Sequence, residues 1–212
     1  MIETLVELYK SNPKYYCTDK ETEHTYLSVY DKLFGYRKNE KLTILEIGIY
    51  EYAGFYDDKE NKKFGGGSLR LWADYFPKSN VVGIDLRRYC EFKNKRIHQL
   101  TGDVKKIDDF KFTEFDIIID DASHNLNDQI FSVKKFYPML KEDGLLIIED
   151  VQQKNYIEEF KKIGIPFQIV DNTYIKSRYD DILLVYRALP KKEHTIQTYE
   201  TLYIDRVNSL HL

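Results

Sequence analysis

The stretch that decides the fold is residues 115–124, with the sequence FDIIIDDASH. Its first half is apolar and β-branched, which is typical of a buried strand. The strand then stops abruptly on two acids, a small residue, a serine and a histidine. Charged groups at the end of a buried strand cost stability, and ligands bind at the carboxyl edge of open α/β sheets. This segment therefore predicts a functional site.

A second stretch ends in the same way. Residues 145–148, with the sequence LLII, run directly into Glu149 and Asp150. Four carboxylates and one imidazole thus follow two predicted strands. This combination favours a metal site with a base beside it.

The rest of the chain alternates strands with helices, which predicts an α/β fold: a mostly parallel sheet with helices on both faces. The last two of seven strands are separated by a loop, so we expect an antiparallel last strand. The expected strands are 42–48, 81–85, 96–100, 115–120, 145–148, 167–170 and 182–186. The expected helices are 2–10, 24–34, 68–76, 126–140 and 155–163, with a polar loop over 15–20.

A chain of 212 residues suits a single domain with a sizeable core. We expect a helical cap over residues 1–40, a core over 41–189 and a C-terminal tail over 190–212. Segment 50–64 makes the connection after the first strand much longer than the usual length of about two to six residues, so it is an insertion. Its position predicts a substrate lid, together with the N-terminal helices.

The composition excludes some classes of protein. A hydrophobic fraction of 42%, a charged fraction of 32% and a net charge of -3 are ordinary for a soluble protein and point to neither nucleic acid nor membrane as a partner. No basic stripe suits RNA. Cys17 and Cys90 lack metal-type spacing and are expected to be free thiols in a reducing compartment. With no signal-peptide pattern and no spanning apolar run, we expect a cytoplasmic protein.

The ends of the first two strands indicate a cofactor. Gly48 at the first turn lets a cofactor approach the backbone, and Asp85 after the second strand can accept hydrogen bonds from both ribose hydroxyls. The G-x-G-x-x-G fingerprint of dinucleotide-binding proteins is absent. Glu46 would repel a pyrophosphate but could face the ammonium of a cationic cofactor. These features favour S-adenosylmethionine over NAD.

On these residues the sequence resembles the class I S-adenosylmethionine-dependent methyltransferases, which have a Rossmann-like fold. More narrowly, it is similar to the metal-dependent sugar O-methyltransferases that modify macrolide glycosides, the mycinamicin and macrocin type. The matching segments are DDASH at 120–124, ED at 149–150, GGSLRLW at 66–72, TDK at 18–20 and HTY at 24–26. Segment 50–64 departs from that pattern, because members of the family run almost directly from the first turn into Gly-Gly-Ser.

The resemblance implies methyl transfer from S-adenosylmethionine to a hydroxyl of a sugar, on a glycan or a glycosylated natural product. It makes Asp121, Glu149 and Asp150 the ligands of a divalent cation, with Mg²⁺ favoured over Mn²⁺ or Ca²⁺, and it makes Asp121 and His124 catalytic, His124 as general base. The cation would lower the pKa of the hydroxyl and a neutral histidine would take its proton. The cofactor-binding residues that it implies are Glu46, Gly48, Ser68, Asp85, Gly102, Asp103 and Asp120.

Structural alternatives remain open for these residues. The helix after residue 125 could be capped by Ser123, Asn125 or Asn127, with Asp121 helping at its positive end. Glu149 and Asp150 could pair with lysines, and Asp85 could pair with Arg87 or Arg88. Asp103 could simply form a turn. Gly65, Gly66 and Gly67 could serve loop flexibility alone or help a helix start to hold the cofactor carboxylate.

Two other functions remain open. A catechol-type O-methyltransferase shares the metal logic, but its usual ligand set includes an Asn that the pair Glu149 and Asp150 does not match. A non-catalytic adenosyl-binding subunit, whose acids are structural, is the other. The sequence names neither the sugar nor the hydroxyl, and it leaves open whether the chain forms a homo-oligomer.

Overall fold

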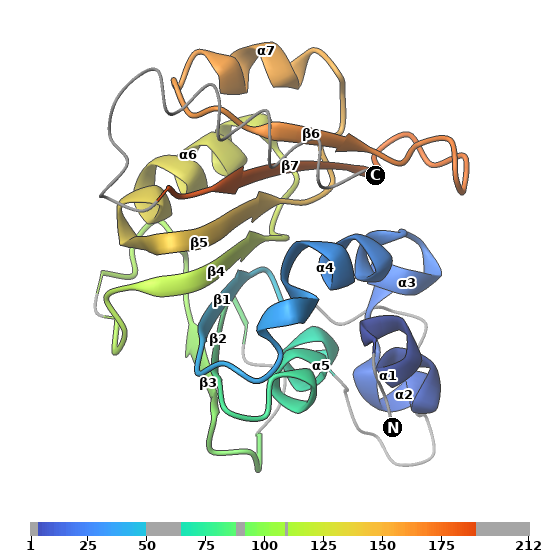
Figure 1. Cartoon of the computed structure of the whole chain (residues 1–212). Helices are drawn as coiled ribbons and strands as arrows, with labels where there is room; N and C mark the ends of the chain where they lie inside the picture. Colours follow the sequence, from blue (N-terminus) through green and yellow to red (C-terminus); the bar gives the residue numbers. More distant parts are fainter. Residues whose placement is uncertain (1–3, 50–64, 88–91, 109, 190–212) are drawn as a thin grey trace.

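A seven-stranded mixed sheet carries the candidate site (Figure 1). The strand order is β3-β2-β1-β4-β5-β7-β6, and β7 is antiparallel to both of its neighbours. The strands are β1 Thr43–Ile47, β2 Asn80–Asp85, β3 Ile97–Thr101, β4 Phe115–Asp120, β5 Leu140–Ile148, β6 Gln168–Asp171 and β7 Ile182–Arg187. The predicted Rossmann-like α/β fold with an antiparallel last strand is confirmed.

The computed structural model describes residues 4–49, 65–87, 92–108 and 110–189. The predicted lid over 50–64 and tail over 190–212 lie outside these residues, so they remain predictions, as does the division into cap, core and tail. Within the described part of the chain, no helix is both long enough and apolar enough to cross a membrane.

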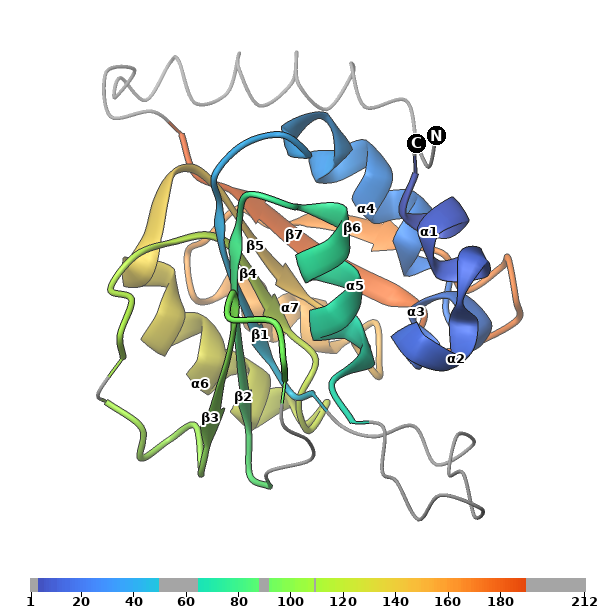
Figure 2. The same cartoon turned by 90° about the horizontal axis from the view of Figure 1, so that it is seen from below.

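Helices cover both faces of the sheet (Figure 2). On one face lie α1 Leu5–Ser11, α2 Pro13–Tyr16, α3 Asp19–Thr22, α4 Tyr26–Phe34 and α5 Gly67–Tyr75. On the other face lie α6 Leu126–Phe136 and α7 Tyr156–Lys161. Two short 3-10 turns, η1 Gly35–Arg37 and η3 Tyr137–Met139, directly follow α4 and α6. Strand β4 is buried along its whole length: Ile117 and Ile119 pack towards α4 and α5, and Ile118 packs with Val133 and Phe136 of α6. This two-sided burial explains the run of three isoleucines, Ile117, Ile118 and Ile119.

The loop predicted over 15–20 is wrong, because two short helices occupy the segment from Pro13 to Thr22. Pro13 ends α1 but also opens α2, where its missing N–H is not needed, and the Asn12 side chain accepts the N–H of Tyr15. The Thr18 side chain accepts the N–H of Lys20 at the start of α3. Lys20, in the first turn of α3, is fully buried.

Candidate active site at the carboxyl edge of the sheet

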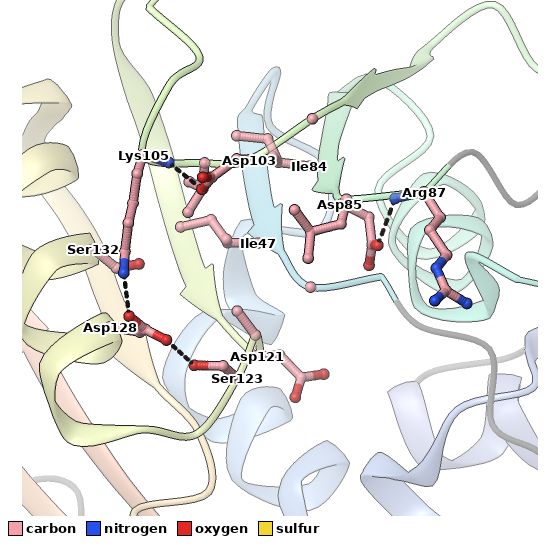
Figure 3. Close-up of a pocket in the computed structure, with 15 residues that line it drawn as sticks. Ile47, Ile84, Asp85, Arg87, Asp103, Lys105, Asp121, Ser123, Asp128 and Ser132 are labelled. Atoms are coloured by element: carbon pink, nitrogen blue, oxygen red, sulfur yellow. Dashed lines mark hydrogen bonds and ion pairs between the residues drawn. The ribbon is translucent and has the colours of Figure 1, made fainter.

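A cavity of about 570 Å³ lies at the carboxyl ends of β1, β2, β3 and β4 (Figure 3). Four of the predicted cofactor-binding residues line it: Gly48, Asp85, Gly102 and Asp103. Asp121 lines the same cavity from the end of β4. The edge of the sheet that the sequence pattern predicts to bind a ligand therefore contains a cavity.

The carboxylate of Asp85 is held in place by backbone groups. It accepts the N–H of Ile49 at 3.0 Å with one oxygen and the N–H of Arg87 at 3.1 Å with the other. The contact with Arg87 is therefore made by the main chain, and Arg88 lies outside the described residues. Each carboxylate oxygen has a second lone pair, so Asp85 can still accept from a ligand in the cavity.

Asp103 lies at the larger cavity, within a turn. It lines the cavity and also forms a turn, in which its side chain accepts the N–H of Lys105 at 3.0 Å. Apolar side chains of Ile47, Ile84 and Val104 complete the wall beside it. The cavity thus combines an apolar wall with carboxylates and other polar groups, which suits a nucleoside.

A smaller cavity of about 170 Å³ adjoins the first, because both are lined by Gly48, Asp121 and Ala122. The predicted residues Ser68 and His124 line this second cavity. Ser68 lies in the first turn of α5, the helix that follows the three glycines. The two cavities together connect the predicted ribose acceptor with the predicted base.

Asp121 and His124, which follow β4, lie next to Asp150, which follows β5. Nε2 of His124 lies 3.3 Å from Oδ1 of Asp121 and 3.3 Å from Oδ2 of Asp150. Ligand atoms of these three residues all lie within 4.8 Å of one another. Two carboxylates and an imidazole at this spacing form a donor set that fits a divalent cation.

The backbone at this cluster is strained. His124 and Asp150 have φ angles of 55° and 53°, in the left-handed region that residues other than glycine rarely adopt. Such conformations cost free energy and gather at functional sites. The imidazole of His124 contacts both Asp121 and Asp150 from this conformation.

The charges of the cluster shift its titration. Burial by itself would lower the pKa of His124, but the hydrogen bond to Asp121 and the charge of Asp150 raise that pKa to about 9. Burial raises the pKa of Asp150 to about 6, helped by the charge of Asp121. In the absence of a cation, His124 is therefore mainly protonated at neutral pH.

Glu149 lies apart from this group, although the resemblance implies that it is a metal ligand. Its carboxylate oxygens lie 2.6 and 2.8 Å from Nζ of Lys20, and one of them also accepts the hydroxyl of Tyr30. Nζ of Lys20 lies a further 2.6 Å from Oδ2 of Asp121. The alternative of pairing with a lysine, left open by the sequence, therefore holds for Glu149 and not for Asp150.

Glu46, predicted to face the cofactor, is fully buried and lines neither cavity. Its Oε2 accepts the indole N–H of Trp72 at 2.9 Å, and its Oε1 lies 3.2 Å from Nζ of Lys20. The reason is the alternation of a strand, which turns Ile47 to the cavity and Glu46 towards α5. The structure therefore gives Glu46 internal partners instead of a place at either cavity.

Asp120 is also buried below the cavities. Its Oδ1 accepts the N–H of Ala122 at 3.2 Å, so it braces the turn that carries Asp121. Burial raises its pKa to about 7. Capping of α6 is done by Asn125, whose side chain accepts the N–H of Asn127, and not by Asp121.

The sequence reasoning assigned no role to several residues of the cap that reach the site. The hydroxyl of Tyr26 lies 2.5 Å from Oδ1 of Asp150, and Nδ1 of His24 lies 3.3 Å from the same atom. Lys20 contacts three carboxylates. The segments TDK and HTY that hold these residues were visible in the sequence, but nothing local to them indicates a partner on a distant strand end.

Comparisons with known proteins agree with the fold. No family model matches the chain. Among curated proteins, it is 31% identical over 140 residues to the 8-demethyl-8-alpha-L-rhamnosyl tetracenomycin-C 2'-O-methyltransferase of Streptomyces olivaceus, covering 64% of this chain and 35% of that one. It is 30% identical over 133 residues to the mycinamicin VI 2''-O-methyltransferase of Micromonospora griseorubida, covering 60% and 32%. The chain thus spans about a third of the length of these relatives.

Among solved structures, the mycinamycin-pathway methyltransferase MycE in complex with Mg and SAH superposes with a TM-score of 0.67 at 21% identity. The match covers 91% of this chain and 56% of MycE. The SAH-bound methyltransferase PaMTH1 of Podospora anserina matches with a TM-score of 0.52 at 16% identity, covering 90% and 89%. The chain therefore has the Rossmann-like fold of the class I methyltransferases, and in sequence it is similar to the sugar O-methyltransferases of glycosylated natural products.

Proposed function

We propose that the chain transfers a methyl group from S-adenosylmethionine to a hydroxyl of a sugar on a glycosylated natural product, with the help of a divalent cation. The observation that carries the proposal is the pair of adjoining cavities, with carboxylates suited to a ribose at one end and the cluster of Asp121, His124 and Asp150 at the other. The sugar acceptor is proposed from the similarity to relatives that methylate sugar hydroxyls.

The larger cavity supports the cofactor part of the proposal. Asp85 stands at the end of β2, held by two backbone N–H groups, where it can accept from the two hydroxyls of a ribose. Ile84 and Val104 offer apolar surface to the adenine ring of the cofactor. Asp103, at the end of this wall, can accept a hydrogen bond from the exocyclic amine of that ring. Ser68 lines the smaller cavity, where we place the amino-acid end of the cofactor.

The cluster supports a cation. Asp121 and Asp150 would hold it through oxygen atoms, the donor type that Mg²⁺ prefers. When bound, S-adenosylmethionine supplies the methyl group, and Mg²⁺ lowers the pKa of an acceptor hydroxyl. MycE, which shares the fold, was solved with Mg and SAH.

The protein's own residues then orient the hydroxyl and remove its proton. His124 borders the smaller cavity, 3.3 Å from both acids, so a hydroxyl held beside them lies within reach of the imidazole. The imidazole takes the proton as the oxygen attacks the methyl carbon. Because this attack requires alignment with the departing sulfur, the fixed carboxylates and the strained backbone of His124 contribute mainly by positioning.

Calorimetry and turnover assays test the proposal. We expect S-adenosylhomocysteine to bind the chain, and radiolabelled methyl groups to pass to rhamnosylated polyketides only when Mg²⁺ is present. Transfer to a catechol instead would identify the small-phenol alternative. Binding of S-adenosylhomocysteine without transfer to either class of acceptor would favour the non-catalytic adenosyl-binding subunit. Full activity in excess EDTA would contradict the metal part.

A further inference from the structure

We propose that Lys20 is a built-in cation of this site: it takes the place beside Glu149 that a metal would otherwise fill, and it confines the divalent cation to the outer oxygens of Asp121 and Asp150. Lys20 is then a positioning residue, and Glu149 serves Lys20 instead of the metal. This inference rests on the proposed function for the presence of the metal, and on the geometry for the role of Lys20.

The position of Lys20 supports this role. Its side chain is fully buried, and its Nζ lies 2.6 Å from Asp121, 2.6 Å from Glu149 and 3.2 Å from Glu46. Glu46 lies one residue before the end of β1, and Asp121 and Glu149 directly follow β4 and β5, so one ammonium joins three strands of the sheet. A buried charge is tolerated only when it is paired, and here the pairing is threefold.

The oxygens of the two proposed ligands are divided between an inner and an outer side. The inner Oδ2 of Asp121 contacts Lys20, and the inner Oδ1 of Asp150 accepts the hydroxyl of Tyr26. The outer Oδ1 of Asp121 and the outer Oδ2 of Asp150 both face Nε2 of His124 at 3.3 Å. The N-terminal cap therefore holds one oxygen of each acid and leaves the other facing His124.

Glu149 has no outer side of this kind. Both of its oxygens contact Nζ of Lys20, one of them also accepts from Tyr30, and the side chain is 1% exposed. A divalent cation and an ammonium cannot occupy the same point between Glu149 and Asp121, because like charges in a buried site repel strongly. As long as Lys20 is in place, the cation is held without Glu149.

This arrangement makes the cap part of the active site. Lys20 comes from α3 and Tyr26 from the first turn of α4, whereas the acids that they hold belong to the sheet. The carboxylates are thereby oriented before any cation arrives. Such preorganised support of ligands is a common requirement of metal sites.

Mn²⁺ titrations followed by electron paramagnetic resonance test the proposal without any need for turnover. Glu149→Gln should leave the affinity for Mn²⁺ unchanged, whereas Asp150→Asn should weaken it by about tenfold or more. Lys20→Met exposes Glu149 and the inner oxygen of Asp121 to the ion, so it should bind Mn²⁺ more tightly than the wild type. In the Lys20→Met background, Glu149→Gln should now weaken binding by about tenfold.

Lys176→Met is the matched control. Nζ of Lys176 donates to the carbonyl oxygens of Thr22 and His24 at 3.2 and 2.6 Å, so it clamps the same cap from outside without touching the acid cluster. This variant should keep the wild-type affinity for Mn²⁺. Equal losses in Glu149→Gln and Asp150→Asn, in the wild-type background, would overturn the proposal and return Glu149 to the ligand set.

Urea unfolding separates this proposal from the proposed function. If the wild type bound no Mn²⁺, the metal part of the proposed function would be refuted. The pairing of Lys20 with Glu149 could still be measured. Lys20→Met should be strongly destabilised, and adding Glu149→Gln should restore part of the loss, since it removes the unpaired buried acid. Additive losses in the double variant would overturn the role of Lys20. If Lys20→Met does not fold, the comparison of Glu149→Gln with Asp150→Asn decides alone.

Discussion

A Cβ atom added to Gly48 would lie 1.9 Å from the backbone carbonyl oxygen of Asp121. The two residues follow β1 and β4, which are neighbours in the sheet, and the N–H of Asp121 donates to the carbonyl of Ile47 at 2.8 Å. Gly48 also has a φ angle of 83°. The turn that presents the candidate acid therefore rests directly on the turn of the first strand, where no side chain fits.

Gly48→Ala should consequently destabilise the fold more than backbone strain alone can explain. The clash with the main chain of Asp121, added to the left-handed conformation, predicts a loss of about 3 kcal/mol or more. Gly164 provides the control, because its φ of 80° is similar and no atom lies within 4 Å of its Cβ position. Gly164→Ala should lose only about 1 kcal/mol. Urea denaturation measures both, and equal losses would refute the packing argument.

Asp85→Asn tests the cofactor cavity. The amide keeps the shape of the side chain but loses an acceptor oxygen and the negative charge, so the affinity for S-adenosylhomocysteine should fall by about tenfold or more. Asp108→Asn is a suitable control, since this side chain is 87% exposed and does not line the cavity. Calorimetry gives both constants. An unchanged affinity in Asp85→Asn would remove Asp85 from the cofactor site.

The buried Asp120 should make stability depend on pH in an unusual direction. Its pKa is about 7 in the folded protein and about 4 in an unfolded chain, so the folded state binds the proton more tightly. Its contribution to the free energy of unfolding is therefore fully present below pH 4. This contribution, roughly 4 kcal/mol in total, is lost as the pH rises through 7. In metal-free buffer, Asp120→Asn should gain stability over the wild type as the pH rises from 4 to 8.

Asp128 supplies a control of opposite sign for this pH dependence. Its hydrogen bonds to Lys105 and Ser123 lower its pKa, so its contribution is present above the unfolded pKa and is lost as the pH falls. Thermal unfolding of Asp128→Asn should therefore approach that of the wild type at low pH. If the difference in stability between the wild type and Asp120→Asn did not change between pH 4 and pH 8, the account of Asp120 would be contradicted.

Local sequence pattern was enough to predict the edge of the sheet where the site lies. The end of an apolar run fixes where Asp121 and His124 leave β4, and the turn after β2 fixes Asp85, because parallel strands present their carboxyl ends together. Alternation along β1 also contained the information that Glu46 and Ile47 face opposite sides. The assignment of Glu46 to the cofactor site ignored this alternation.

The partners of the acids could not be predicted in the same way. Lys20 contacts Asp121 across 101 positions of the chain and Glu149 across 129, and Tyr26 contacts Asp150 across 124. A short polar segment between proline and a helix gives no local sign of such contacts, since they depend on how the cap packs against the sheet. Which carboxylate meets an ammonium and which meets the cavity was therefore decided by tertiary structure.

Metal binding and the titration of His124 should be linked. The bond to Asp121 and the charge of Asp150 keep the pKa of His124 at about 9 without a cation. A divalent ion on the outer oxygens of the same acids opposes the imidazolium, so Mg²⁺ should lower this pKa towards neutrality, which is where a general base works best. By reciprocity, the affinity for Mg²⁺ should rise between about pH 7 and pH 9, as His124 loses its proton.

NMR of the His124 imidazole with and without Mg²⁺, together with calorimetry across this range, measures both sides of the linkage. In His124→Ala, Mg²⁺ affinity should lose its dependence on pH in this window, whereas an identical dependence in that variant would show that another group carries the coupling.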